Sequence, residues 1–307
     1  MSLTAAAASL PGRLLFVADA NVWLLERGQL HAVTTDRVSR QPSWSADGQR
    51  VALTKLWTSG ADLWTLDADG RGAQELTDFT YRDDARQNFA LEPIWSPDGT
   101  RLYFLSQEAT QDTQLWQLTL ADKRRQRFLT HGERFGGIDH PRIAPNGRTL
   151  AVTSFQPGRG PTGRPQIWTY ALPGGPWRQL TEAPGGAYDP EWSPDGRLTY
   201  TVRSPDVGRS SGRHDVWVMR ADGSGQRPVT TSGLNRAPAW SPDGSAILFL
   251  SARSGVFDAW LVPAPSDSLP ATGSAAPTLA AAPAAAVARQ ITQNAALDAT
   301  SGLAWAR

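Results

Sequence analysis

Short apolar runs separated by polar turns recur along the chain at regular intervals. Runs such as Leu102–Leu105 and Ala246–Leu250 are too short for helices and are bounded by Pro, Asp and Gly. No helical periodicity lies between them. The pattern therefore predicts units of short antiparallel strands.

The most regular segment of each unit is a Pro-x-Trp-Ser-Pro-Asp-Gly motif. It is complete at 93–99, 190–196 and 238–244, nearly complete at 42–48 and weaker at 141–147. The closing glycines, at 48, 99, 147, 196 and 244, are 51, 48, 49 and 48 residues apart. Pro, Asp and Gly stand in the order typical of a type I turn. A fixed period of this size indicates an array of supersecondary units.

Each unit can be divided into four strands. The Pro-x-Trp segment is the first, and its proline indicates an edge strand, since proline donates no backbone hydrogen bond. The apolar run is the second. The third ends in an apolar residue and Trp after a polar residue, and the fourth ends in an apolar residue and Thr. The polar residues are Asp62, Gln114, Gln166, Asp215 and Asp258, and the threonines are Thr77, Thr130, Thr181, Thr230 and Thr292.

The units number six if the two ends of the chain share one. Residues 13–17, 21–23 and 31–34 read as second, third and fourth strands, and 301–305 reads as the missing first strand. The predicted fold is all-β: a six-bladed β-propeller of four-stranded antiparallel blades, closed by the C-terminal strand in the N-terminal blade. This closure removes the free edges of an open array. Eleven of the 13 tryptophans occupy repeat positions, all but Trp57 and Trp177, which predicts packing between blades.

The domain prediction is one propeller over residues 13–307, preceded by a flexible lead-in at 1–12. The last unit is longer than the others because of an Ala/Pro-rich stretch at 263–288. Its composition cannot bury a core, so a loop insertion is expected between the third and fourth strands.

The motif Pro-x-Trp-Ser-Pro-Asp-Gly, followed by Leu-Trp and Leu-Thr pairs, resembles the TolB-type, WD-repeat-like propeller repeat. The resemblance runs from about Arg13 to Trp305 and concerns the propeller part alone, since the chain has no room for TolB's additional α/β domain. It implies a bacterial protein of the periplasm or the extracellular space. Such repeats occur in periplasmic translocation partners, prolyl-oligopeptidase-like peptidases, sensor ectodomains and polysaccharide lyases.

The composition limits the classes of partner that the chain is expected to bind. The chain has 30 basic and 29 acidic residues among 307, so nothing indicates nucleic acid or an anionic membrane. There is no cysteine, and no apolar stretch approaches the length of a membrane span. The first ten residues lack the features of a signal peptide. We expect a monomer with a protein or peptide partner.

Two motifs typical of enzymes lack their structural context. Gly158–Gly163 satisfies G-x-G-x-x-G, but no helix follows it. Gly208–Gly212 satisfies G-x-S-x-G, but it lies in a predicted strand-to-strand loop. We therefore predict no catalytic residue, no cofactor and no enzymatic activity.

The candidate site is the residue before each repeat proline, because the fold places these positions equivalently while their identities vary. They should ring the mouth of the channel: Gln41, Glu92, His140, Asp189, Ala237 and, by alignment, Gly302. Glu92, His140 and Asp189 could converge on a small polar ligand or a cation. Asp139, Arg142 and Arg236 would assist them. The alternative is a water-filled polar channel, and a single His is a sparse ligand set for a metal.

The leading functional prediction is a non-catalytic platform for a protein or peptide, using the channel mouth and the loops 78–91 and 155–166 on the same face. One alternative is a propeller that binds a small molecule or metal at the mouth, with lyase-like chemistry. Another is a sensor or accessory domain of a larger protein.

Overall fold

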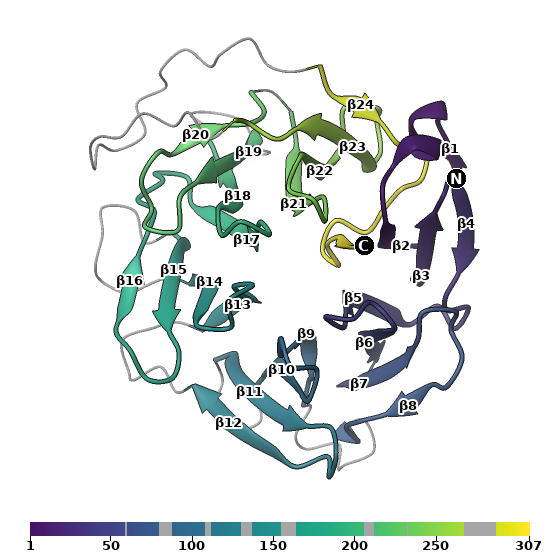
Figure 1. Ribbon diagram of the computed structural model, residues 1–307, viewed down its shortest axis with the longest axis vertical. Helices are drawn as coiled ribbons and strands as arrows, with labels where there is room; N and C mark the ends of the chain where they lie inside the picture. The colour runs from purple at the N-terminus through teal and green to yellow at the C-terminus, as the bar shows by residue number, and fades with distance from the viewer. Residues whose placement is uncertain are drawn as a thin grey trace.

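A computed structural model describes residues 1–58, 60–79, 88–107, 112–129, 137–154, 164–205, 212–231, 233–266 and 287–307. These residues form six four-stranded antiparallel sheets arranged radially around a common axis (Figure 1). The predicted six-bladed propeller is thereby confirmed. No helix among the described ranges is long and apolar enough to span a membrane.

The blades follow one another in chain order, and each is numbered from its innermost strand outward. Blade 1 contains β26 (Ala304–Ala306), β2 (Arg13–Ala18), β3 (Asn21–Glu26) and β4 (Gln29–Ala32). Blade 2 contains β5 (Ser39–Trp44), β6 (Arg50–Trp57), β7 (Gly60–Asp67) and β8 (Gln74–Glu75). Blade 3 contains β9 (Leu91–Trp95), β10 (Arg101–Ser106), β11 (Gln114–Thr119) and β12 (Arg125–Leu129). Blade 4 contains β13 (Ile138–Ile143), β14 (Thr149–Ser154), β15 (Gln166–Ala171) and β16 (Trp177–Gln179). Blade 5 contains β17 (Ala187–Trp192), β18 (Leu198–Arg203), β19 (His214–Met219) and β20 (Arg227–Pro228). Blade 6 contains β21 (Asn235–Trp240), β22 (Ala246–Ser251), β23 (Asp258–Pro263) and β24 (Arg289–Gln290).

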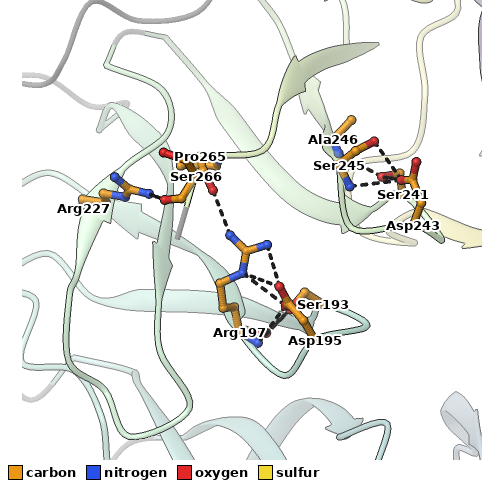
Figure 2. Close-up of polar contacts among 10 residues, drawn as sticks. All are labelled: Ser193, Asp195, Arg197, Arg227, Ser241, Asp243, Ser245, Ala246, Pro265 and Ser266. Atoms are coloured by element: carbon orange, nitrogen blue, oxygen red, sulfur yellow. Dashed lines mark hydrogen bonds and ion pairs between the residues drawn. The ribbon is translucent and has the colours of Figure 1, made fainter. Parts of the chain in front are cut away.

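The turn between the first and second strands is fixed by its own Ser and Asp side chains. In blade 6, the Ser241 hydroxyl donates to Asp243 Oδ1 at 2.6 Å and accepts the Ala246 N–H at 2.9 Å (Figure 2). The hydrogen bonds from Ser241 and from the Ser245 N–H lower the pKa of Asp243 to about 2. Ser193 and Asp195 form the same turn in blade 5. The Ser-x-Asp pair of the repeat is thus a turn-forming device.

Tryptophans of the first strands join neighbouring blades, as predicted. The Trp44 indole N–H donates to the Ala304 carbonyl of blade 1 at 3.2 Å, and the Arg13 guanidinium of that blade lies 4.7 Å from the Trp44 ring centroid. Trp95 donates in the same way to the Ser43 carbonyl of blade 2. An amphipathic ring between two sheets buries apolar area and satisfies a backbone acceptor.

The polar residue of the third strand and the threonine of the fourth form a buried latch. In blade 6, the Thr292 hydroxyl donates to Asp258 Oδ1 at 3.0 Å and accepts the Ala259 N–H at 2.9 Å. Asp258 also accepts the Ala295 N–H. Equivalent hydrogen bonds join Thr77 to Asp62, Thr181 to Gln166 and Thr230 to Asp215. The latch satisfies backbone groups where the short fourth strand ends.

The ring closes as predicted, and the N-terminal segment adds a second junction. Strand β26 pairs with β2, with Trp305 opposite Leu14. Strand β1 (Ser2–Leu3) pairs with β25 (Thr292–Gln293), and the 3₁₀ helix η1 (Ala5–Ser9) follows it. Ala7 and Leu10 are buried in the core between the first and last blades. Residues 1–12 are therefore not a free lead-in, because this apolar stretch covers core that the last blade leaves open.

The predicted insertion at 263–288 begins in described residues, although 267–286 lie outside them. Pro263 ends β23, and two arginines of blade 5 hold the residues after it. Arg197 donates to the Pro265 carbonyl at 2.8 Å, and Arg227 donates to the Ser266 carbonyl at 2.7 Å (Figure 2). The chain leaving β23 is thus fixed across the junction of blades 5 and 6.

Candidate functional site

The residue before each repeat proline, and Gly302 at the aligned position before Leu303, have a left-handed backbone. The φ angles are 51° at Gln41, 51° at Glu92, 50° at His140, 52° at Asp189, 50° at Ala237 and 69° at Gly302. In blades 2 to 6 the pairing of first and second strands shifts register at or beside this residue, as between Arg40 and Ser43. The residue and its proline form a β-bulge, which redirects side chains and tolerates a proline without an N–H. We call these six residues the axial ring.

A cavity of about 660 Å³ occupies the propeller axis and is lined by the whole axial ring. In blade 2 its lining runs from Gln41 along the strand to Gly48, and in blade 1 it includes residues 299–307. It therefore extends toward the turns between first and second strands. The hairpins between second and third strands lie at the other end of the blades, because consecutive strands are antiparallel.

This geometry corrects one expectation. The axial ring was predicted at a channel mouth on the same face as the loops 78–91 and 155–166. Instead, five of the ring residues lie within the inner strands and Gly302 lies just before β26, and the cavity extends from the ring toward the opposite face. In blades 2 to 6 the reason is the bulge, which places the ring residue within the strand. Residues 80–87 and 155–163 of those two loops lie outside the described residues.

Charged residues of blades 3, 4 and 5 meet on one side of the ring. His140 Nε2 lies 3.3 Å from Asp189 Oδ1 and 3.7 Å from Glu92 Oε1. Asp189 Oδ2 also accepts the Thr201 hydroxyl at 2.9 Å and the Ala237 N–H at 3.3 Å. Burial alone would raise the pKa of Asp189, but His140, Arg236 and these hydrogen bonds hold it below its ordinary value.

A second ion pair lies one step further along the cavity. Arg142 Nε donates to Glu191 Oε2 at 2.6 Å, linking blades 4 and 5. Burial raises the pKa of Glu191 despite Arg142. Glu191 was not predicted as a site residue. The available signal was its position, since it follows the repeat proline of blade 5 as Arg142 follows that of blade 4.

The opposite side of the cavity is small and apolar. Blade 6 contributes Ala237 and Ala239, and blade 1 contributes Gly302 and Ala304. The cavity is consequently two-sided, with ionic groups on blades 3 to 5 facing small side chains on blades 6 and 1. Glu92 Oε2 and His140 Nδ1 are buried and have no hydrogen-bond partner among the described residues. These atoms leave hydrogen-bonding capacity for a ligand.

The predicted site residues separate into two groups. Five line the cavity: Gln41, Glu92, His140, Arg142 and Asp189. Asp139 and Arg236 do not line it. They directly precede ring residues, on the side facing away from the cavity, where Asp139 is exposed and Arg236 Nη2 lies 3.6 Å from Asp189 Oδ1.

Gln41 has a structural role as well as a lining one. Its side-chain oxygen accepts the Glu92 N–H at 3.0 Å and so joins blades 2 and 3.

Across the portion of the chain that is described, no group of three His, Cys, Asp or Glu residues is arranged to hold a metal ion. The motif at 158–163, and all of 208–212 except Gly212, lie outside the described residues.

Comparison with known proteins gives a consistent picture. Residues 138–270 match the family model of the TolB beta propeller domain. A segment of 104 residues is 36% identical to the Tol-Pal system protein TolB of Anaeromyxobacter dehalogenans, covering 33% of this chain and 21% of that protein. A segment of 148 residues is 29% identical to the uncharacterized peptidase YuxL of Bacillus subtilis, covering 47% of this chain and 21% of that protein. The matches thus span about a fifth of these relatives.

Solved structures share the fold. The crystal structure of TolB from Acinetobacter baumannii superposes with a TM-score of 0.70 at 17% identity, covering 96% of this chain and 66% of that one. An oligogalacturonate lyase in complex with manganese superposes with a TM-score of 0.54 at 16% identity, covering 88% and 72%. At such identities the likeness concerns the fold alone.

Proposed function

Since the chain is a TolB-type six-bladed β-propeller, we propose that it is a non-catalytic interaction platform that receives a segment of a protein partner in its axial cavity. The observation that carries the proposal is the two-sided cavity. Its volume of about 660 Å³ lies within the range of about 300–1,000 Å³ for ligand sites. Rigid inner strands hold its lining residues, so little ordering is required on binding.

The charges around the ring favour a partner segment with a cationic side chain. Near the ring, the three carboxylates of Glu92, Asp189 and Glu191 outnumber the two guanidinium groups of Arg142 and Arg236. Asp189 and Glu191 already have partners, whereas Glu92 Oε2 has none among the described residues. A Lys or Arg of the partner would pair with Glu92, while its apolar neighbours would pack on Ala239 and Ala304.

The test is capture of a partner from an envelope extract of the source organism. Glu92→Gln removes the negative charge of this carboxylate, and Glu92→Lys reverses it. Capture should fall at least about tenfold for Glu92→Lys, because like charges across an interface are strongly unfavourable. Glu182→Gln, an exposed carboxylate away from the cavity, is the matched control. Equal capture by all three variants would rule out the axial cavity as the binding site.

We propose a bacterial periplasmic location for this activity. The support is similarity to proteins named Tol-Pal system protein TolB. Fractionation of the source cells, with the chain followed by antibody, tests the location directly. Recovery in the cytoplasmic fraction alone would contradict it.

The alternative function of the cavity is binding of a small molecule or a metal ion. Calorimetric titration with manganese, calcium and zinc, using the wild type and His140→Ala, separates the two functions. Heat that disappears in His140→Ala would favour the alternative. Absence of heat together with partner capture would favour the platform. The idea of a sensor or accessory domain is tested by the full reading frame.

A further inference from the structure

Two arginines and a histidine lie on neighbouring strands at the junction of blades 5 and 6, outside the axial cavity. Arg203 ends β18 and lies directly opposite His214, which begins β19. The His214 N–H donates to the Gly233 carbonyl at 3.0 Å, and His214 forms an isolated bridge with Leu234. These contacts place the start of β21, which carries Arg236, beside His214. None of the three residues lines the axial cavity.

The positive charge of this cluster is incompletely neutralised. Within the described ranges, the Arg203 side chain has no hydrogen bond or ion pair. Arg236 Nη2 is 3.6 Å from Asp189 Oδ1, but its Nε is buried and has no hydrogen-bond partner among the described residues. Asp189 already interacts with His140, Thr201 and the Ala237 N–H. One carboxylate is therefore shared among several donors.

The carboxylate of Asp215 does not serve the cluster either. It accepts from the Thr230 hydroxyl at 3.0 Å and from Asn235 Nδ2 at 3.3 Å, and it pairs with Arg213 Nε at 3.1 Å. These contacts use its acceptor positions within the latch of blade 5. Among the described residues, no carboxylate pairs with the Arg203 side chain.

The pKa of His214 reflects the positive electrostatic potential of the two neighbouring arginines. Burial and the charges of Arg236 and Arg203 lower the pKa of His214, against the opposing effects of Asp189 and the Gly212 carbonyl. The other described charged groups beside it are Arg213 and Asp215. A bound anion would raise the pKa of His214, since it would stabilise the imidazolium.

We propose that Arg203, His214 and Arg236 form a binding site for a single oxyanion, a carboxylate or a phosphate group. Two guanidinium groups and an imidazole offer planar N–H donors that match the oxygens of such a group. The cluster lies on the side of the axial ring facing the hairpins between second and third strands. It is therefore distinct from the cavity, and the proposal stands or falls independently of the proposed function.

NMR of the histidine imidazoles is the direct test. The full chain is titrated with sodium phosphate and, separately, with sodium acetate at constant ionic strength kept with sodium chloride. The His214 signals are assigned with His214→Gln. We expect a saturable change of the His214 signals and an upward shift of its pKa. Affinity should increase as the pH falls, because protonation of His214 adds a third cation.

Variants of Arg203 make the outcome decisive. Arg203→Gln should weaken anion binding about tenfold, the effect of losing one charge-assisted hydrogen bond. Arg203→Lys keeps the charge without the fork and should lie between. Arg148→Gln, an exposed arginine on a turn of blade 4, should bind like the wild type. Thermal unfolding checks that each variant is folded.

Comparison of the phosphate and acetate titrations identifies the chemical source of the oxyanion. Tighter phosphate binding would indicate a phosphate ester, and tighter acetate binding would indicate a carboxylate such as an acidic side chain or a chain end. A response to both anions no greater than that to chloride would overturn the proposal. So would equal affinity of the wild type and the folded Arg203→Gln variant.

Discussion

Replacing Ala237 with glycine tests whether the axial ring carries backbone strain. Ala237 has φ 50°, and a left-handed backbone costs an L-residue roughly 1–2 kcal/mol. Ala239 lies two residues further along the same strand, is also buried and is not among the residues with positive φ. Ala239→Gly is therefore a matched control with the same loss of a methyl group.

The expected free energies follow from three contributions. Each substitution removes one buried methyl, worth about 0.8 kcal/mol, and adds unfolded-state entropy worth roughly 0.5–1 kcal/mol. Ala239→Gly should thus destabilise the fold by about 1.5 kcal/mol. Ala237→Gly regains the strain and should change stability by about zero. The hydrogen bond from the residue 237 N–H to Asp189 is kept in the variant.

Urea unfolding followed by tryptophan fluorescence measures the difference between the two variants. The difference should be roughly 1–2 kcal/mol, the strain of one left-handed residue. If both substitutions destabilise the fold equally, the left-handed ring is not strained at Ala237. The reasoning that links the bulge to the redirected side chains would then lose its energetic basis.

Four further predictions concern the closure, the latch and the turns. Gly302→Ala should destabilise the fold by roughly 0.5–1 kcal/mol in urea unfolding, since the strain of about 1–2 kcal/mol at φ 69° is offset in part by the lower entropy of the unfolded chain, and the methyl would meet no closer neighbour than Arg142 Nη2 at 4.0 Å. Thr292→Val should lower the free energy of unfolding by about 1–3 kcal/mol, because it leaves the Ala259 N–H without its acceptor and removes one of the donors to Asp258 Oδ1. Asp243→Asn should destabilise the fold at pH 7, and the difference from wild type in urea midpoint should vanish as the pH falls from about 4, its unfolded pKa, through about 2, its folded pKa. Deleting residues 303–307 should lower the thermal midpoint sharply, since it removes the β26–β2 pairing and buried Leu303; an unchanged midpoint would contradict closure through this strand.

The blades could be predicted from the repeat because each repeat position has one structural role. The Ser-x-Asp pair forms the turn, and Trp44 and Trp95 join blades. Both halves of the latch were visible as a polar residue before Trp and a Thr in the fourth strand. Their hydrogen bond was not predicted, since it depends on the register between third and fourth strands.

The sequence identified most residues of the candidate site but not their position along the propeller axis. Glu92 and His140 carry no sequence signal for a left-handed backbone, because that conformation arises from the bulge and the proline that follows. The face toward which the cavity extends could not be predicted without this left-handed bulge. Glu191 was missed because a glutamate after a repeat proline resembles a solvated charge until Arg142 is placed beside it.

The two junctions at the chain ends bear on the order of folding. Blades 2 to 6 each pair strands that follow one another in sequence, whereas β26–β2 and β1–β25 join segments nearly the whole chain apart. Such long-range contacts are entropically slow to form, so blades 2 to 5 should assemble before the ring is sealed. Amides in β2 and β26 should accordingly exchange with deuterium sooner than those in β14 or β18, and any opening of the native ring should begin there.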